Sequence, residues 1–537
     1  MRTALLRLLA LLLSVMMLLC GCIPDFQSYL NDILDENLPT AYRDMEYTRP
    51  DPAQLESALD TACTFAETAP SLEELLDAIQ NFYQVYDRFY TDYRLAEIYY
   101  CSDLTNSYWH EEYNYCAESV PQWDAALDTL YRALAASPLR DVLEDEEYFG
   151  ADYFDVYEGE SIWDETYLSM LEQEAELINR YYTLSDEALA TEYYSEEYFS
   201  TFTMPMTELL VSLIALRQQI AAYCGFSDYA EYAYASGYAR DYTPQQAEPY
   251  LEQVGQTLYD VYCQANDSDV WAFGSAYCST TDTFDYLANA ADAMGGAIWE
   301  AFYVLSACGL YDIGYNANKY DSSFETYLWS YGTPFIFMNP YRDQSDKLTF
   351  SHEFGHFAND YVCGGSYAGT DIAEVHSQAF EYLSLCYTEN SEELTRWKMV
   401  DSLSTFVECS AYALFEQRIY RLTGNDLTAE NLLALYEEVG KEFGFDSWDW
   451  DSRDLITVTH FFTHPMYNIS YVVSNDLAMQ FYQLEQEESG KGLTLYEQCL
   501  YSEDSYLLYF AQEYGLESPF SPGRLASIKA TFEAALQ

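Results

Sequence analysis

The chain has 537 residues, with 23 Lys and Arg against 89 Asp and Glu, so its formal net charge at pH 7 is −66. Such an acidic surface repels nucleic acid and anionic lipid headgroups, which excludes a nucleic-acid-binding role. Half of the residues are hydrophobic and 17% are aromatic, a composition that excludes an intrinsically disordered chain. The length predicts a large core that is divided into two or more subdomains.

The N-terminus has the pattern of a secretory signal that ends at a lipid-attachment site. Two arginines precede an apolar run at residues 8–19, which is too short for a comfortable membrane-spanning helix. The sequence LCGC at residues 19–22 resembles the lipobox of bacterial lipoproteins. That resemblance implies removal of residues 1–21, a lipid on Cys22, and a place on the extracytoplasmic face of a bacterial cell membrane. The alternative is an ordinary cleaved signal and a soluble secreted protein.

Helical periodicity dominates the rest of the chain. Ser71 is predicted to cap one helix, and Thr207 is predicted to cap another. Pro244 suits the first turn of a third helix, whose pattern continues through residues 246–265, and residues 429–440 show the same periodicity. The predicted fold is therefore mainly α. A change in composition near residue 200 divides an N-terminal helical region, residues 22–200, from a second region, residues 201–537.

Strand signal is concentrated at residues 335–338. Pro334 and Pro340 flank this run, which predicts a short strand or an edge strand. An exposed edge can accept an extended peptide as an additional strand. An ordinary buried strand is the alternative.

The most informative feature is the HExxH pattern formed by His352, Glu353 and His356, in a chain that has only six histidines. Residues i and i+4 of an α-helix lie on one face, so both histidines can reach one metal ion, with Glu353 rotated off that pair. Asp346 is predicted to cap this helix, and the glycines at 364–365 are predicted to end it. The alternative is a helix whose histidines are paired for packing or surface reasons.

Catalytic zinc usually takes three protein ligands, so a third must come from another segment. Residues 371–381 predict a helix with an apolar face and a polar, acidic face that carries Glu374 and Glu381. Glu374 is favoured as the ligand over Glu381, and His376 is a further option. Glu374 also fits a capping box with Asp371, which would give it a purely structural role.

At these residues the sequence resembles the thimet oligopeptidase and oligoendopeptidase F family of zinc metallopeptidases. HEFGH is intact, and IAEVHSQ at residues 372–378 is similar to the second metal-binding segment of that family. The resemblance extends over roughly residues 205–490 and implies Glu374 as the third zinc ligand. Two residues depart from the family pattern, His376 in place of a proline and Asn359 in place of a frequent histidine.

The resemblance implies a zinc oligopeptidase, with a small β-sheet beside the zinc helix and a deep cleft that the N-terminal helices partly enclose. Short peptides would be cleaved by zinc-activated water, with one Zn²⁺ per chain and Glu353 as the general base. The candidates for stabilising the oxyanion lie in a segment similar to the family's histidine- and tyrosine-rich loop: His460, His464, Tyr467 and Tyr471.

Two other functions are compatible with the same motif. One is a carboxypeptidase or dipeptidase, in which a basic residue would bind the substrate's terminal carboxylate; Arg342, Lys347 and Arg453 are candidates. The other is a zinc- or peptide-binding lipoprotein without catalysis, although such a protein has no need of Glu353 between the two histidines.

Overall fold

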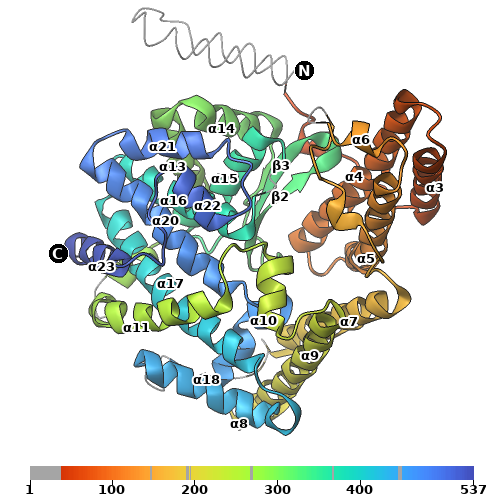
Figure 1. Cartoon of the computed structure of the whole chain (residues 1–537). Helices are drawn as coiled ribbons and strands as arrows, with labels where there is room; N and C mark the ends of the chain where they lie inside the picture. Colours follow the sequence, from red (N-terminus) through yellow and green to blue (C-terminus); the bar gives the residue numbers. More distant parts are fainter. Residues whose placement is uncertain are drawn as a thin grey trace, which may run out of the picture.

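The computed structural model describes residues 38–145, 148–188, 191, 193, 195–266, 270–365, 368–445 and 450–536. The predicted signal and the lipid-attachment site at Cys22 lie outside this part of the chain. Most of the described residues are helical, and the helices surround one three-stranded sheet (Figure 1). The predicted mainly α fold with a small sheet is confirmed.

The α-helices of the described residues follow one another along the whole chain. They are α3 (Pro52–Thr68), α4 (Leu72–Ser102), α5 (Ser107–Ala135), α6 (Arg140–Leu143), α7 (Glu165–Ala188), α8 (Glu196–Tyr198), α9 (Met204–Tyr223), α10 (Tyr229–Tyr232), α11 (Pro244–Asn266), α12 (Val270–Gly274), α13 (Thr280–Met294), α14 (Gly296–Cys308), α15 (Asp346–Cys363), α16 (Thr370–Cys386), α17 (Glu392–Ile419), α18 (Ala429–Phe443), α19 (Thr459–Thr463), α20 (Asn468–Glu487), α21 (Lys491–Cys499), α22 (Leu507–Glu513) and α23 (Arg524–Ala535).

Two of the predicted helix starts are confirmed. Ser71 caps α4, because its side chain accepts a hydrogen bond from the backbone N–H of Glu74. Pro244 is the first residue of α11, where a missing N–H costs no helical hydrogen bond. The periodic run that begins near residue 429 forms α18.

The cap predicted at Thr207 is wrong. A short π-helix at Phe199–Thr203 leads directly into α9, so the helix has already begun before the chain reaches Thr207. The hydroxyl of Thr207 donates to the carbonyl of Thr203 at 2.7 Å, as a threonine inside a helix does.

The sheet contains β1 (Tyr311–Asp312), β2 (Ser323–Leu328) and β3 (Thr333–Met338), in the order β1-β3-β2. β3 pairs in parallel with β1 and antiparallel with β2, and all six of its residues are buried. The prediction of an edge strand at residues 335–338 is therefore wrong, and an added peptide strand has no free edge there. The outer strand beside α15 is β2, which contacts both α15 and α4.

The main hydrophobic core is built around α15, α16, α17 and α20, and a separate core cluster joins α3, α4 and α5. Residues on both sides of position 200, such as Leu95 and Phe354, belong to the main core. The regional division at residue 200 stays a prediction. Helical residues 196–223 are long and apolar enough to cross a membrane, and half of their apolar window is buried within the protein. The eleven cysteines of the described residues are free thiols.

Candidate active site

The helix that carries HExxH is α15, and it is held by its apolar residues. Phe350, Phe354 and Phe357 are fully buried on the side away from the two histidines. Gly364 ends the helix in a left-handed conformation, as predicted. The predicted cap is wrong, because Asp346 lies inside the first turn. Its carboxylate accepts backbone hydrogen bonds from residues 341 and 342 and fixes the incoming loop instead.

Gly355, in the middle of HEFGH, allows α16 to approach α15 closely. A Cβ atom at this position would lie 2.5 Å from the Cα of Ser377 and 2.7 Å from the carbonyl oxygen of His376. Any other residue would push the two helices apart. The glycine therefore has a direct part in bringing Glu374 to the histidines.

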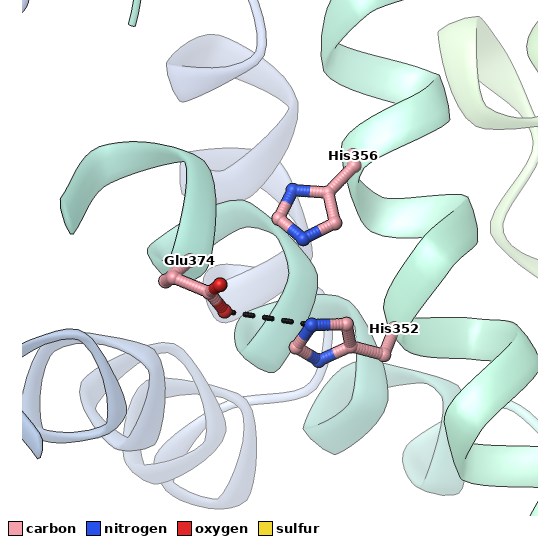
Figure 2. A group of neighbouring side chains, drawn as sticks. All are labelled: His352, His356 and Glu374. Atoms are coloured by element: carbon pink, nitrogen blue, oxygen red, sulfur yellow. Dashed lines mark ion pairs between the residues drawn. The ribbon is translucent and has the colours of Figure 1, made fainter. Parts of the chain in front are cut away.

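The imidazoles of His352 and His356 project from α15 toward the carboxylate of Glu374 on α16 (Figure 2). One ligand atom from each of the three residues lies within 4.8 Å of the other two. The distance from His352 Nε2 to Glu374 Oε2 is 3.4 Å, and the Glu374 side chain is only 3% exposed. Two imidazole nitrogens and one carboxylate oxygen form the donor set of many catalytic zinc sites.

Glu374 is not part of a capping box, because α16 begins after Gly369 and no side chain caps it. Its carboxylate instead accepts hydrogen bonds from Tyr467, at 2.6 Å, and from Ser377, at 3.2 Å. The capping-box alternative for Glu374 is therefore wrong.

Glu381 lies behind His352 rather than beside the metal-ligand atoms. Its Oε1 is 2.9 Å from His352 Nδ1, and its Oε2 accepts a 2.6 Å hydrogen bond from the buried Nζ of Lys398. A carboxylate on one ring nitrogen orients the imidazole so that the other nitrogen can bind a metal. Sequence reasoning missed Lys398, which carries no motif and comes from α17.

The charges around His352 favour a cation at this point of the site. Burial lowers the pKa of His352, but the hydrogen bond to Glu381 and the charges of Glu374 and Glu381 outweigh burial and raise the pKa to about 9. Burial and the charge of His352 hold the pKa of His356 well below its usual value. A divalent ion bound by neutral imidazoles would supply a positive charge that stabilises the ionised carboxylates of Glu374 and Glu381, so the donor set fits zinc.

Glu353 stands next to the cluster but outside it. Its side chain is almost fully buried, and its Oε1 accepts a 2.7 Å hydrogen bond from Ser323, the first residue of β2. Burial raises the pKa of Glu353 to about 7, and the charges of Glu374 and Glu381 act in the same direction. Ser323 was not predicted from the sequence, because nothing in β2 marks it as chemically special.

The four oxyanion candidates lie together near the start of α20. One of them, Tyr467, donates its hydroxyl hydrogen bond to Glu374. The hydroxyl of Tyr471 lies 3.4 Å from His460 Nε2, and its ring centroid lies 5.1 Å from that of Tyr467. His464 is exposed, with Nδ1 2.9 Å from the hydroxyl of Thr463.

Other predicted candidates have different partners. The ring of His376 is fully buried against Tyr496 and Phe510, and His376 does not belong to the group of residues whose ligand atoms lie within 4.8 Å of one another. Each possible carboxylate clamp is engaged elsewhere: Arg342 stacks on Tyr315, Lys347 donates to Gln344, and Arg453 pairs with Asp451.

Comparisons with known proteins bear on the fold that carries this site. Residues 42–161 match the family model of the peptidase M3 N-terminal domain. A solved structure assigned as oligoendopeptidase F superimposes with a TM-score of 0.78 at 20% identity, covering 93% of this chain and 98% of the other. The chain has the fold of the oligoendopeptidase F structures.

Two further structures give similar superpositions. PZ peptidase A with an inhibitor gives a TM-score of 0.78 at 18% identity, over 92% of this chain and 98% of the other. A structure from Bacillus anthracis str. Ames that is assigned as oligoendopeptidase F gives a TM-score of 0.75 at 19% identity, over 93% of this chain and 98% of the other. A search of curated proteins gives no match. The resemblance inferred from HEFGH is confirmed at the level of the fold and of the N-terminal family model.

Proposed function

We propose that this M3-type peptidase is a lipid-anchored, extracytoplasmic zinc oligopeptidase that hydrolyses peptide bonds in short peptides. The observation that carries the proposal is the position of Glu353, buried beside the His352, His356 and Glu374 cluster without belonging to it. A protein that only binds zinc has no need of a carboxylate placed in this way.

The proposed mechanism assigns a separate task to each side chain. His352, His356 and Glu374 would hold zinc, which when bound acts as a Lewis acid and makes water reactive at neutral pH. Glu353 accepts the proton of the attacking water and delivers it to the leaving amine. Its hydrogen bond from Ser323 keeps the carboxylate in one orientation.

The oxyanion donor is assigned to Tyr471, with His460 beside it. Tyr467 is less suited to that task because its hydroxyl is already donated to Glu374. Tyr471 lies one helical turn further along α20, with its hydroxyl turned to His460 rather than to a carboxylate.

An extended substrate would add to the outer edge of β2 rather than to β3. The first residue of β2, Ser323, is in hydrogen-bond contact with Glu353, so a peptide along this strand would pass the general base. Pairing through the backbone requires free N–H and C=O groups, which an unstructured peptide has and a folded domain lacks.

The charge of the chain adds a preference for cationic peptides. Removal of residues 1–21 takes away two of the 23 basic residues, and 21 − 89 gives a net charge of −68. Lys398 and Arg240, two buried cations near the cluster, are each bound to a carboxylate. A strongly negative field raises the association rate of positively charged ligands, and salt screens that effect.

Peptides of about ten residues, with matched cationic and anionic sequences, should be cleaved internally by the mature protein, whereas a stably folded small protein at equal mass should persist. A chelator should abolish cleavage and zinc should restore it. The cationic peptide should have the higher kcat/KM at low salt, by roughly tenfold or more, and lose that advantage at high salt. Equal cleavage of peptide and folded protein would contradict an oligopeptidase, and stepwise release of C-terminal residues would identify a carboxypeptidase instead.

The lipid anchor is supported by the lipobox-like sequence at residues 19–22. Cys22→Ala should shift the protein from the membrane fraction to the soluble fraction, or block signal processing, because the thioether to lipid cannot form. Cys63→Ala, which changes a free thiol among the described residues, is the matched control and should stay with the membrane. A processed Cys22→Ala protein that remains membrane-bound would overturn this part of the proposal.

A further inference from the structure

The chain makes a left-handed turn at Met466, between α19 and α20. This residue has φ +69°, a conformation that side chains other than glycine rarely adopt, and it is 2% exposed. A buried methionine keeps such a backbone only where its surroundings hold it there.

Two buried charged side chains bind the peptide groups of this turn. Glu416 Oε1, on α17, accepts a 2.8 Å hydrogen bond from the N–H of Met466. Arg240 Nη2 donates a 3.0 Å hydrogen bond to the carbonyl oxygen of the same residue. The N–H and the carbonyl oxygen of Met466 are thus both held by charged side chains, and these two side chains come from segments far apart in the sequence.

Each member of this pair is itself fixed. Glu416 Oε2 accepts from Asn468 Nδ2 at 3.0 Å. Arg240 donates to Asp371 Oδ1 at 3.3 Å and to Ser470 Oγ at 2.8 Å, and its guanidinium lies over two tyrosine rings at 4.4 Å. Asp371 lies in the first turn of α16, three residues before Glu374, so Arg240 links the turn to the helix that carries the third ligand.

The residue after the turn is Tyr467, whose hydroxyl donates to Glu374 Oε1 at 2.6 Å. We infer that Glu416 and Arg240 are positioning residues, which hold Met466 left-handed so that Tyr467 orients the Glu374 carboxylate toward the two histidines. The inference rests on the proposed function in one respect, the assignment of Glu374 as a zinc ligand.

The test compares Glu416→Leu, which removes both acceptors at nearly constant volume, with Glu416→Gln, which keeps an acceptor for the Met466 N–H. Glu416→Leu should lower zinc affinity, measured by competition with a chromophoric chelator, by about 10–100-fold, the loss typical of groups that orient a ligand. It should also speed amide hydrogen exchange at residues 464–471. Glu416→Gln should retain zinc affinity to within a few-fold.

A matched control is available at the other end of α20. Glu485 is also buried and accepts backbone hydrogen bonds, from Gly490 at 2.6 Å and Leu493 at 3.1 Å. Glu485→Leu should lower the thermal unfolding temperature and speed exchange near residues 488–494, without changing zinc affinity. This control therefore distinguishes a general loss of folding stability from a loss of zinc affinity caused by a misplaced Glu374.

A second background tests the turn itself. Glycine adopts positive φ without strain, so Glu416→Leu should cost less zinc affinity in a Met466→Gly background than in the natural chain. Similarly, in a Tyr467→Phe background, Glu416→Leu should cause little further loss of zinc affinity.

Two results would overturn the inference: exchange at 464–471 that does not change in Glu416→Leu, or faster exchange with unchanged zinc affinity. If the natural chain binds no zinc, the ligand assignment and the proposed function fail together, and hydrogen exchange still reports whether the pair holds the turn.

Discussion

Glu353→Gln is expected to leave about one zinc ion bound per chain and to lower kcat by roughly 10²–10⁴. The amide is the same size as the carboxylate and can still accept the hydrogen bond from Ser323, so the local structure should persist. It cannot accept a proton from water. Zinc content by elemental analysis and turnover of a ten-residue peptide, measured on the same preparation, check both parts of the prediction.

The control for this change is Glu485→Gln. Glu485 is another buried glutamate, lies at the far end of α20 and accepts hydrogen bonds from backbone amides at the start of α21. It should retain both zinc and turnover. Loss of zinc from Glu353→Gln would make this residue a ligand, and retained turnover would mean that another group acts as the base.

Glu374→Ala is expected to lose zinc almost completely, whereas Glu381→Ala should weaken binding by roughly 10–100-fold. The difference follows from geometry, because Glu374 offers an oxygen to the same point as the two histidines, whereas Glu381 contacts the far nitrogen of His352. Titration of the metal-free proteins with zinc, monitored against a competing chelator, gives the order directly.

Removal of Glu381 also leaves the buried ammonium of Lys398 without its 2.6 Å partner. The double change Glu381→Ala with Lys398→Met removes that unpaired charge and serves as the control for stability. If zinc binding is lost in Glu381→Ala and kept in Glu374→Ala, the two carboxylates have exchanged roles and the proposed site is wrong.

Features that depend on neighbouring residues in the chain could be predicted from the sequence. The spacing of His352 and His356 places both on one helical face whatever surrounds the helix. Ser71 and Pro244 start helices, and Gly364 ends one, because capping and φ preferences act within one turn. These local effects, with the family resemblance of HEFGH, were enough to indicate the chemistry.

Features that depend on which distant segments meet could not be decided in that way. Glu374 and Glu381 both lie on the polar side of one helix. Only the packing of α16 against α15 and α17 directs Glu374 to the ligand atoms of the two histidines, and Glu381 to the far nitrogen of His352 and to Lys398. The same limit explains the misplaced edge strand, because β1 and β2 enclose β3 through pairings that its own residues do not encode.

The sequence by itself therefore determined the helical class and the residues able to bind zinc and accept a proton. The tertiary structure decided which other side chains each of them contacts. It brought Ser323 to Glu353 and placed Tyr467 on Glu374 through the turn at Met466. Local patterns select which groups are available, but orientation depends on hydrogen bonds between different segments, here 30 and 93 residues apart, and those form only when the core packs.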